Sequence, residues 1–170
     1  FGMGGVGIFT YLALKLFKPK NVIIIEKNQK KLTKLNNLKI DGKLIKYEKN
    51  IQFLKEKILK SNNNELGDYV IDCTGNINSM NKCMHLIKKK GTFLFASHPE
   101  NSKSLIIKPH DLISGKKIYG SWGGGINLQK DKNLLTKFYN KVFLKSKLKK
   151  LVKVYALQDI NLAIKDLKKG

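Results

Sequence analysis

The sequence predicts an α/β domain in which short parallel strands alternate with helices, so that a doubly wound sheet lies between two helical layers in a three-layer α/β/α arrangement. Three observations predict it. A G-x-G-x-x-G turn from Gly2 to Gly7 is followed at once by an apolar stretch, and the β-branched run at residues 22–25 ends in the acid Glu26. Beyond Glu26, short apolar runs alternate with apolar stripes at helical spacing.

The first part of the chain is expected to alternate between helix and strand. Residues 6–17 are apolar nearly all round, which predicts a buried helix, and Pro19 ends it because proline cannot continue the helical hydrogen bonds. Residues 22–25 predict a fully buried parallel strand. Asn28 is expected to cap a short helix that runs to about Leu35. A strand at 44–47, a helix that ends near Ser61 and a strand at 68–73 follow.

The second part of the chain continues this alternation. An apolar stripe predicts a helix, which Gly91 is expected to end before a strand at 92–96. The stripe consists of Met80, Cys83, Met84 and Ile87. Short strands are expected at 106–108 and 116–120, with a helical turn at 110–113 between them. A helix with an apolar face over 134–143, a strand at 152–155 and a helix at 159–168 complete the prediction. No domain boundary is visible.

The composition is strongly basic, with a formal net charge of +22, yet all 34 basic residues are lysines. Arginine is the preferred residue for bidentate contacts to phosphates and bases, so no specific nucleic-acid partner is expected. A solvated lysine surface is the simpler interpretation. Cys73 and Cys83 show no zinc-ligand spacing, and two thiols with apolar neighbours suit a reducing cytoplasm. No apolar window is long enough to span a membrane, so no membrane partner is expected.

The glycine turn and the acid together predict a dinucleotide site. Gly2 permits a tight turn, Gly4 lets the backbone approach a pyrophosphate, and Gly7 lets the helix pack closely against the sheet. The helix that follows offers unpaired N–H groups to the phosphates. Glu26 lies about 20 residues further on, where a carboxylate can accept both ribose hydroxyls. The alternative is a plain glycine turn with a solvated Glu26.

Four segments in a common order resemble the cofactor domain of medium-chain, zinc-type alcohol dehydrogenases, and especially their glutathione-dependent formaldehyde dehydrogenase branch. The segments are residues 1–7 with Glu26, residues 68–76, residues 116–121 with the glycines after them, and residues 155–163. The resemblance covers essentially the whole chain. It implies that residues 1–170 form one NAD(P)-binding Rossmann-type domain, truncated at both ends and lacking its first strand and the N-terminal catalytic domain. In the order of such a sheet, that first strand lies in the middle.

The resemblance also implies a set of cofactor-binding residues. The backbone of Gly4, Gly5 and Val6 would hold the pyrophosphate between Gly2 and Gly7, and Glu26 with Lys31 would contact the adenosine ribose. Further along the chain, the implied contacts are Thr74 and Gly75, then Ala96, Ser97 and His98 toward the nicotinamide amide, and finally Ser121 and Trp122. NAD is expected rather than NADP, because a second anion beside Glu26 is unfavourable, although Lys27 and Lys31 weaken that preference.

The resemblance implies an enzyme that passes a hydride between an alcohol or aldehyde and NAD. Its zinc is expected only in the catalytic domain, so no catalytic residue and no metal ligand are assigned to this chain. His85, His98 and His110 are not spaced as ligands. A homo-oligomer that pairs through the last sheet strand is implied as well.

Two alternatives remain. A Rossmann-like methyltransferase also uses a glycine turn and an acid, but residues 68–76 and the loop after Gly120 disfavour it. A non-catalytic nucleotide-sensing or polyanion-binding module is the other, and it would fit the high lysine content.

Overall fold

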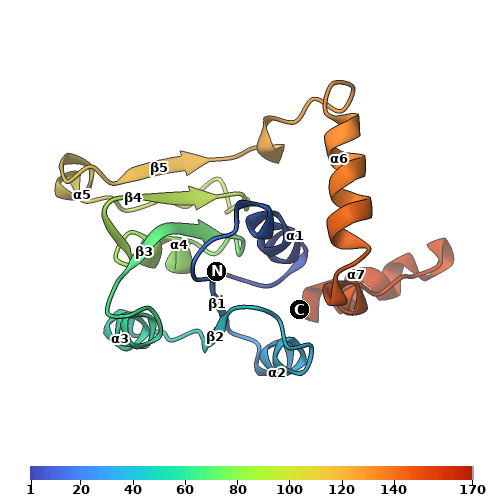
Figure 1. Ribbon diagram of the computed structural model, residues 1–170, viewed down its shortest axis with the longest axis horizontal. Coiled ribbons are helices and arrows are strands. Elements are labelled where there is room, and N and C mark those ends of the chain that lie inside the picture. The colour runs from blue at the N-terminus through green and yellow to red at the C-terminus, as the bar shows by residue number, and fades with distance from the viewer. Residues whose placement is uncertain (170) are drawn as a thin grey trace.

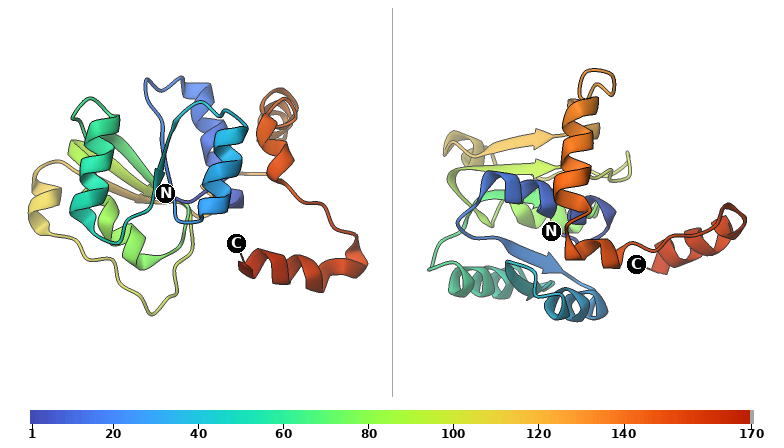
Figure 2. Two further views of the ribbon diagram at one scale, coloured as in Figure 1. Left: turned by 90° about the horizontal axis from the view of Figure 1, so that it is seen from below. Right: turned by 45° about the vertical axis from the view of Figure 1, so that its right-hand side comes forward.

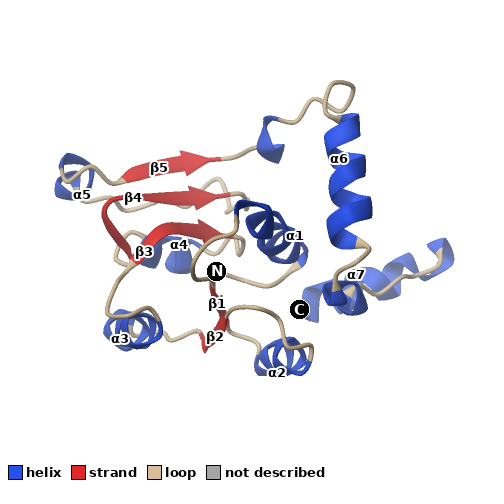
Figure 3. Ribbon diagram, in the orientation of Figure 1, coloured by secondary structure: helices blue, strands red, loops and turns tan. Residues whose placement is uncertain are grey.

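The computed structural model describes residues 1–169, in which five parallel strands form two sheets (Figure 1). The strands are β1 (Ile23–Glu26), β2 (Lys43–Lys46), β3 (Gly67–Asp72), β4 (Ile87–Phe95) and β5 (Lys117–Gly120). One sheet has the order β1-β2 and the other β3-β4-β5. Figure 3 shows the arrows of β3, β4 and β5 pointing the same way.

Phe1 and Gly2 lie between the two sheets and hydrogen-bond to both. The Gly2 amide donates to the carbonyl of Ile25 at 2.8 Å, and the Cys73 amide donates to the carbonyl of Phe1 at 2.9 Å. The spatial order is therefore β2, β1, the Phe1–Gly2 segment, β3, β4 and β5. This order confirms the doubly wound parallel α/β fold, with the first two residues in the central position.

Helices cover both faces of the sheets, as the left view of Figure 2 shows for α1 and α2 on one side and α3 and α4 on the other. The helices are α1 (Gly5–Leu14), α2 (Gln29–Asn37), α3 (Ile51–Ser61), α4 (Ile77–Cys83), α5 (Pro109–Ile113), α6 (Lys132–Phe138) and α7 (Ile160–Lys169). Alternate strand residues face opposite layers. Ile24 packs in one cluster with Leu12 and Leu35, whereas Ile25 packs in another with Leu54 and Ile58.

Each of the first three strands leads into a helix capped by asparagine. The side-chain oxygens of Asn28, Asn50 and Asn76 accept backbone N–H groups from the first turns of α2, α3 and α4. Such a cap replaces a missing intrahelical partner and is worth about 1 kcal/mol. The cap expected at Asn28 is confirmed.

The helix expected to run through Ile87 and end at Gly91 is wrong in its second half. α4 ends at Cys83, and Ile87 already begins β4, which contains Gly91. Ile87 is buried in the same apolar cluster as Met80 and Cys83. The apolar stripe therefore identified the buried residues correctly, although they do not all belong to one helix.

Three smaller expectations are also corrected. Residues 106–108 and 152–155 are not strands of either sheet, and Val154 is 88% exposed. The helix at 6–17 is not buried on every side. It comprises α1 and a 3-10 turn at Lys15–Phe17, and Phe17 is 81% exposed.

The C-terminal part packs against α1 and then extends away from it. Phe143, in the π-helical turn Tyr139–Phe143 after α6, stacks on Phe9 of α1 with a centroid distance of 5.0 Å. Figure 2 shows α7 lying beyond this contact and away from the sheets. In residues 1–169, no helix is both long and apolar enough to cross a bilayer.

Candidate functional site

The carboxyl ends of the strands meet the start of α1, and the turns expected to bind a cofactor come together there. Gly2 lies against the Thr74 side chain, which follows β3, and Gly75 lies against the backbone of His98, which follows β4. Ligands of open α/β sheets bind at this edge, where the strand order reverses. The topology therefore places the glycine turn and the loops after β3 and β4 around one site.

The glycines of the turn meet different constraints. Gly2 has a φ of +84°, a backbone conformation that side chains disfavour. A Cβ at Gly7 would lie 1.9 Å from the Gly2 carbonyl oxygen, so no side chain fits there. Around Gly4 and Gly5, by contrast, a Cβ would meet nothing within 4 Å. Gly2 and Gly7 thus shape the turn, whereas Gly4 and Gly5 leave its outer surface open.

The N-terminus of α1 is free to bind an anion. Gly4 caps the helix without a side-chain hydrogen bond, and the first turn carries no acid. The first N–H groups of a helix have no intrahelical acceptor, and the helix dipole favours negative charge beside them. The open glycines and the bare helix end together fit a diphosphate.

Glu26, at the end of β1, is tied to the glycine turn. Its side chain is buried, at 6% exposure, and its Oε2 accepts the Met3 amide at 2.8 Å. Its Oε1 accepts the Asn28 amide at 2.9 Å. The sequence had predicted only a ribose contact for this acid. The carboxylate also braces the turn against β1, while each oxygen retains accepting capacity for a further donor.

Asp72, at the end of β3, was missed by the sequence analysis. It is fully buried and accepts the amides of Thr74 and Gly75 at 3.1 Å each. It also accepts the hydroxyls of Thr74 and of Ser97, the latter from the loop after β4. One carboxylate therefore joins the loops after β3 and β4. An acid that ends an apolar strand two residues before Thr74-Gly75 was the feature that could have indicated it.

The remaining predicted residues line the outer part of the same edge. The rings of His98 and Trp122 meet edge to face at 4.4 Å, and Trp122 is 85% exposed. The Ser121 amide donates to the carbonyl of Phe95 at 2.9 Å, which ties the start of this loop to β4. The Ala96 amide donates to the carbonyl of Asp72 at 3.2 Å. Lys31 lies in the first turn of α2, where its amide donates to the Asn28 side chain.

The thiols and histidines form no second reactive centre in the part of the chain that the structure describes. Burial raises the pKa of the thiols of Cys73 and Cys83, which keeps them protonated and weakly nucleophilic. Among residues 1–169, no group of three or more His, Cys, Asp or Glu side chains is placed to hold a metal ion.

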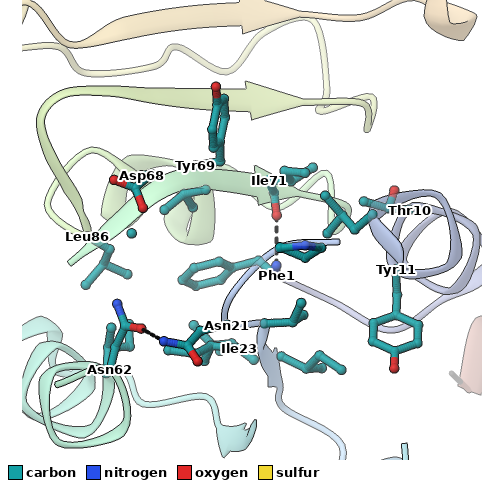
Figure 4. Close-up of a pocket in the computed structure, with 18 of the residues that line it drawn as sticks. Phe1, Thr10, Tyr11, Asn21, Ile23, Asn62, Asp68, Tyr69, Ile71 and Leu86 are labelled. Carbon is teal, nitrogen blue, oxygen red and sulfur yellow. Dashed lines mark hydrogen bonds between the residues drawn. The ribbon is translucent and has the colours of Figure 1, made fainter. Parts of the chain in front are cut away.

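A groove of about 560 Å³ lies between β1 and β3 (Figure 4). Gly2, Gly7 and Cys73 line one end of it. From there it runs back along the strands, away from the edge where the predicted cofactor residues gather. It is therefore a separate feature of the structure.

The chain matches a family model and full-length relatives. The model described as zinc-binding dehydrogenase matches residues 5–140. Alcohol dehydrogenase class-2 isozyme 2 of Oryctolagus cuniculus is 28% identical over 171 residues, which cover 100% of this chain and 44% of that protein. S-(hydroxymethyl)glutathione dehydrogenase of Saccharomyces cerevisiae is 28% identical over 179 residues, with the same coverage. The chain thus spans less than half the length of these relatives.

Solved structures share the fold. Benzyl alcohol dehydrogenase from Acinetobacter calcoaceticus superimposes with a TM-score of 0.81 at 23% identity, covering 99% of this chain and 45% of that one. An alcohol dehydrogenase zinc-binding domain protein from Burkholderia ambifaria gives a TM-score of 0.82 at 20% identity, covering 100% and 45%. The resemblance identified from the sequence is confirmed.

Proposed function

We propose, since this chain belongs to the zinc-binding dehydrogenase family, that it is the NAD(H)-binding portion of an alcohol or aldehyde oxidoreductase. One observation carries the proposal: the bare N-terminus of α1 and the open glycines lie beside a carboxylate, Glu26, that is hydrogen-bonded into the same turn. This is the pairing of groups that a diphosphate and its neighbouring ribose require.

The proposed contact residues fall into three sets, which bind the diphosphate, the adenosine ribose and the nicotinamide end of the cofactor. The amides of Gly4, Gly5 and Val6 bind the diphosphate, and the free accepting capacity of Glu26 binds ribose hydroxyls, with Lys31 beside it. The loops at 74–75, 96–98 and 121–122 orient the nicotinamide end. The nicotinamide itself supplies the hydride chemistry, and these residues hold it in place.

NAD is favoured over NADP at this site. A 2′-phosphate would place a second anion against the buried carboxylate of Glu26, and the cost of bringing two anions together in a poorly solvated place is large. Lys27 and Lys31 reduce that cost without removing it.

The zinc ion, the dimer and the cellular compartment are inferred from family membership. A zinc ion in a separate catalytic domain would act as a Lewis acid on the substrate oxygen. The dimer would form through β5, which is the outer strand of its sheet and exposes Tyr119. The two unpaired cysteines suit a reducing cytoplasm.

Titration with NADH tests the proposal. Trp122 lies at the expected nicotinamide end, so energy transfer from its indole to bound NADH reports occupancy. We expect a saturable signal that persists at moderate salt and is lost in the Gly4→Ala variant, whose added methyl occupies the space that the diphosphate needs. If the chain binds nucleic acid but not NADH, and that binding weakens steeply with salt, the chain is a polyanion-binding module instead.

A further inference from the structure

Two lysine-rich segments that are far apart in the sequence pack into the same part of the fold. Residues 27–39, which contain α2, and residues 141–150, which follow α6, each carry five lysines and no aspartate or glutamate. Leu35 of α2 and Leu148 are buried in one apolar cluster with Leu12 of α1. The left view of Figure 2 shows α6 (orange) on the same side of the sheets as α1 and α2 (blue). Tertiary packing therefore gathers two acid-free segments, with ten lysines between them, on one layer of the molecule.

The ten lysines of these two segments form a surface that we call the basic face. Nine of them are exposed, and Lys31 is half-buried. Within residues 1–169, none of the ten forms an ion pair with a carboxylate, whereas lysines elsewhere do, such as Lys57 with Glu48 and Lys116 with Asp111. The ammonium groups of the basic face therefore keep their full charge toward solvent, where their summed field attracts anions.

The residue types of the basic face favour contacts with phosphates over contacts with bases. Neither segment contains arginine, the residue that reads base edges with two parallel hydrogen bonds. Their one aromatic side chain, Phe143, is stacked on Phe9 and Tyr139, so it is not free for the stacking on which recognition of single strands depends. Lysine ammonium groups bind phosphates as point charges on flexible stems, without a fixed geometry. A ligand with closely spaced phosphates therefore fits this surface.

A nucleic-acid duplex fits the basic face better than an anionic membrane surface does. A helix that lies in a membrane surface inserts an apolar stripe among the lipids. The apolar residues of α2 are instead buried within the protein, since Leu32 is 6% exposed and Leu35 is 0% exposed. A duplex needs no such insertion, because it presents one phosphate charge per about 1.7 Å of its axis and keeps its bases stacked inside.

We propose that the basic face binds double-stranded nucleic acid through its phosphates, independently of base sequence. This binding is separate from that of the cofactor, whose diphosphate is assigned to the backbone amides of the glycine turn, and only Lys31 belongs to both sets of residues. Each phosphate that a lysine neutralises adds about 0.9 to the slope of log affinity against log salt. The affinity for a duplex should therefore fall steeply as the salt concentration rises.

Fluorescence anisotropy with a labelled DNA duplex tests this proposal on the 170-residue chain. One variant carries Lys147→Gln, Lys149→Gln and Lys150→Gln. A second variant carries Lys30→Gln, Lys34→Gln and Lys39→Gln, from the other segment of the basic face. The matched control carries Lys60→Gln, Lys89→Gln and Lys130→Gln, which are exposed lysines outside both segments. All three variants lose the same net charge, so they differ only in where the charge is removed.

The two variants of the basic face should bind the duplex at least about tenfold more weakly than the parent, with a salt slope smaller by about 2–3. The control should change affinity less than about threefold, because charges more than about 10 Å away are screened at 0.1 M salt. Two duplexes of unrelated sequence should bind equally well. Circular dichroism melts of each variant exclude unfolding as the cause of weaker binding.

Several results would overturn the proposal. Equal weakening in the control and in the variants of the basic face would mean that net charge alone causes the binding. Tighter binding of a single strand, or of phosphatidylserine vesicles, than of the duplex would assign this surface to another ligand. A difference of about tenfold or more between the two duplexes would contradict binding through phosphates alone. The readout needs no NADH, so its failure is distinguishable from failure of the proposed function.

Discussion

Replacing Gly7 by alanine should disrupt the turn on which the site depends. The new Cβ would lie 1.9 Å from the Gly2 carbonyl oxygen and 2.9 Å from the Gly2 carbonyl carbon. Both contacts are with backbone, so no side-chain rotation relieves them. Either α1 or the strand-to-helix turn must move by about 1.5 Å before van der Waals distances are restored.

This movement should lower the free energy of unfolding by an amount that can be bounded. Overpacking a tight interior contact costs about 1–3 kcal/mol in free energy of unfolding, and a clash between backbone atoms belongs at the upper end. For a domain of this size, each kcal/mol lowers the melting temperature by about 2–4 °C. We therefore expect Gly7→Ala to lower the melting temperature by about 6–12 °C, and to weaken NADH binding because the α1 amides are displaced.

Circular dichroism melts of three proteins check the reasoning. Gly4→Ala is the matched control, since its Cβ meets nothing within 4 Å and its φ of −79° suits any residue. It should melt within about 2 °C of the parent, because the loss of a glycine cap and the reduced freedom of the unfolded chain nearly offset each other. It should nevertheless lose NADH binding. If Gly7→Ala melts like Gly4→Ala and still binds NADH, the steric account of the turn is wrong.

Three other substitutions test particular groups. Asp72→Asn leaves at least one of the four partly buried donors to this carboxylate without an acceptor, so it should cost about 1–3 kcal/mol in free energy of unfolding. By loosening the loops after β3 and β4, it should weaken NADH binding more than ADP-ribose binding, and equal weakening in a calorimetric comparison would contradict this. Glu26→Gln cannot accept both amides that the carboxylate holds, and we expect NADH affinity to fall about tenfold or more; unchanged affinity would remove Glu26 from the site. Lys116, which donates a hydrogen bond to Asp111 at 2.8 Å, holds the pKa of that carboxyl below its usual value. The ion pair therefore stabilises the fold above about pH 4, and this stabilisation is lost as the pH falls through the lowered pKa of Asp111. Asp111→Asn should accordingly lower the melting temperature at pH 7 but not at pH 2. An equal decrease at both pH values would show that the ion pair is not the cause.

Elements were predictable where local pattern and tertiary burial agree. The run of three isoleucines in β1 is buried on both faces, because Ile24 and Ile25 meet different helical layers. Ile87 is buried with Met80 at a spacing that is compatible with a helix, yet it begins a strand. Residues 152–155 have strand-like composition but belong to neither sheet. Pairing depends on contacts far away in the sequence, which periodicity does not report.

The site was predictable in its positions and less so in its contacts. Spacing alone placed the glycine turn and Glu26 together, because the motif encodes one local βαβ unit. The second role of Glu26, as acceptor for Met3 and Asn28, depends on three-dimensional geometry. Asp72 was overlooked because it reads as the polar end of a strand. Its importance lies in Ser97, which the fold brings to it from another loop.

The central claim is that the turn amides bind a diphosphate beside Glu26. Amide chemical shifts of the ¹⁵N-labelled chain during titration with NADH test it most directly. We expect saturable shifts at the amides of Gly4, Gly5 and Val6, and at Met3, whose amide donates to Glu26. Shifts confined to scattered lysine-rich segments, with the amides of the glycine turn unmoved, would contradict it.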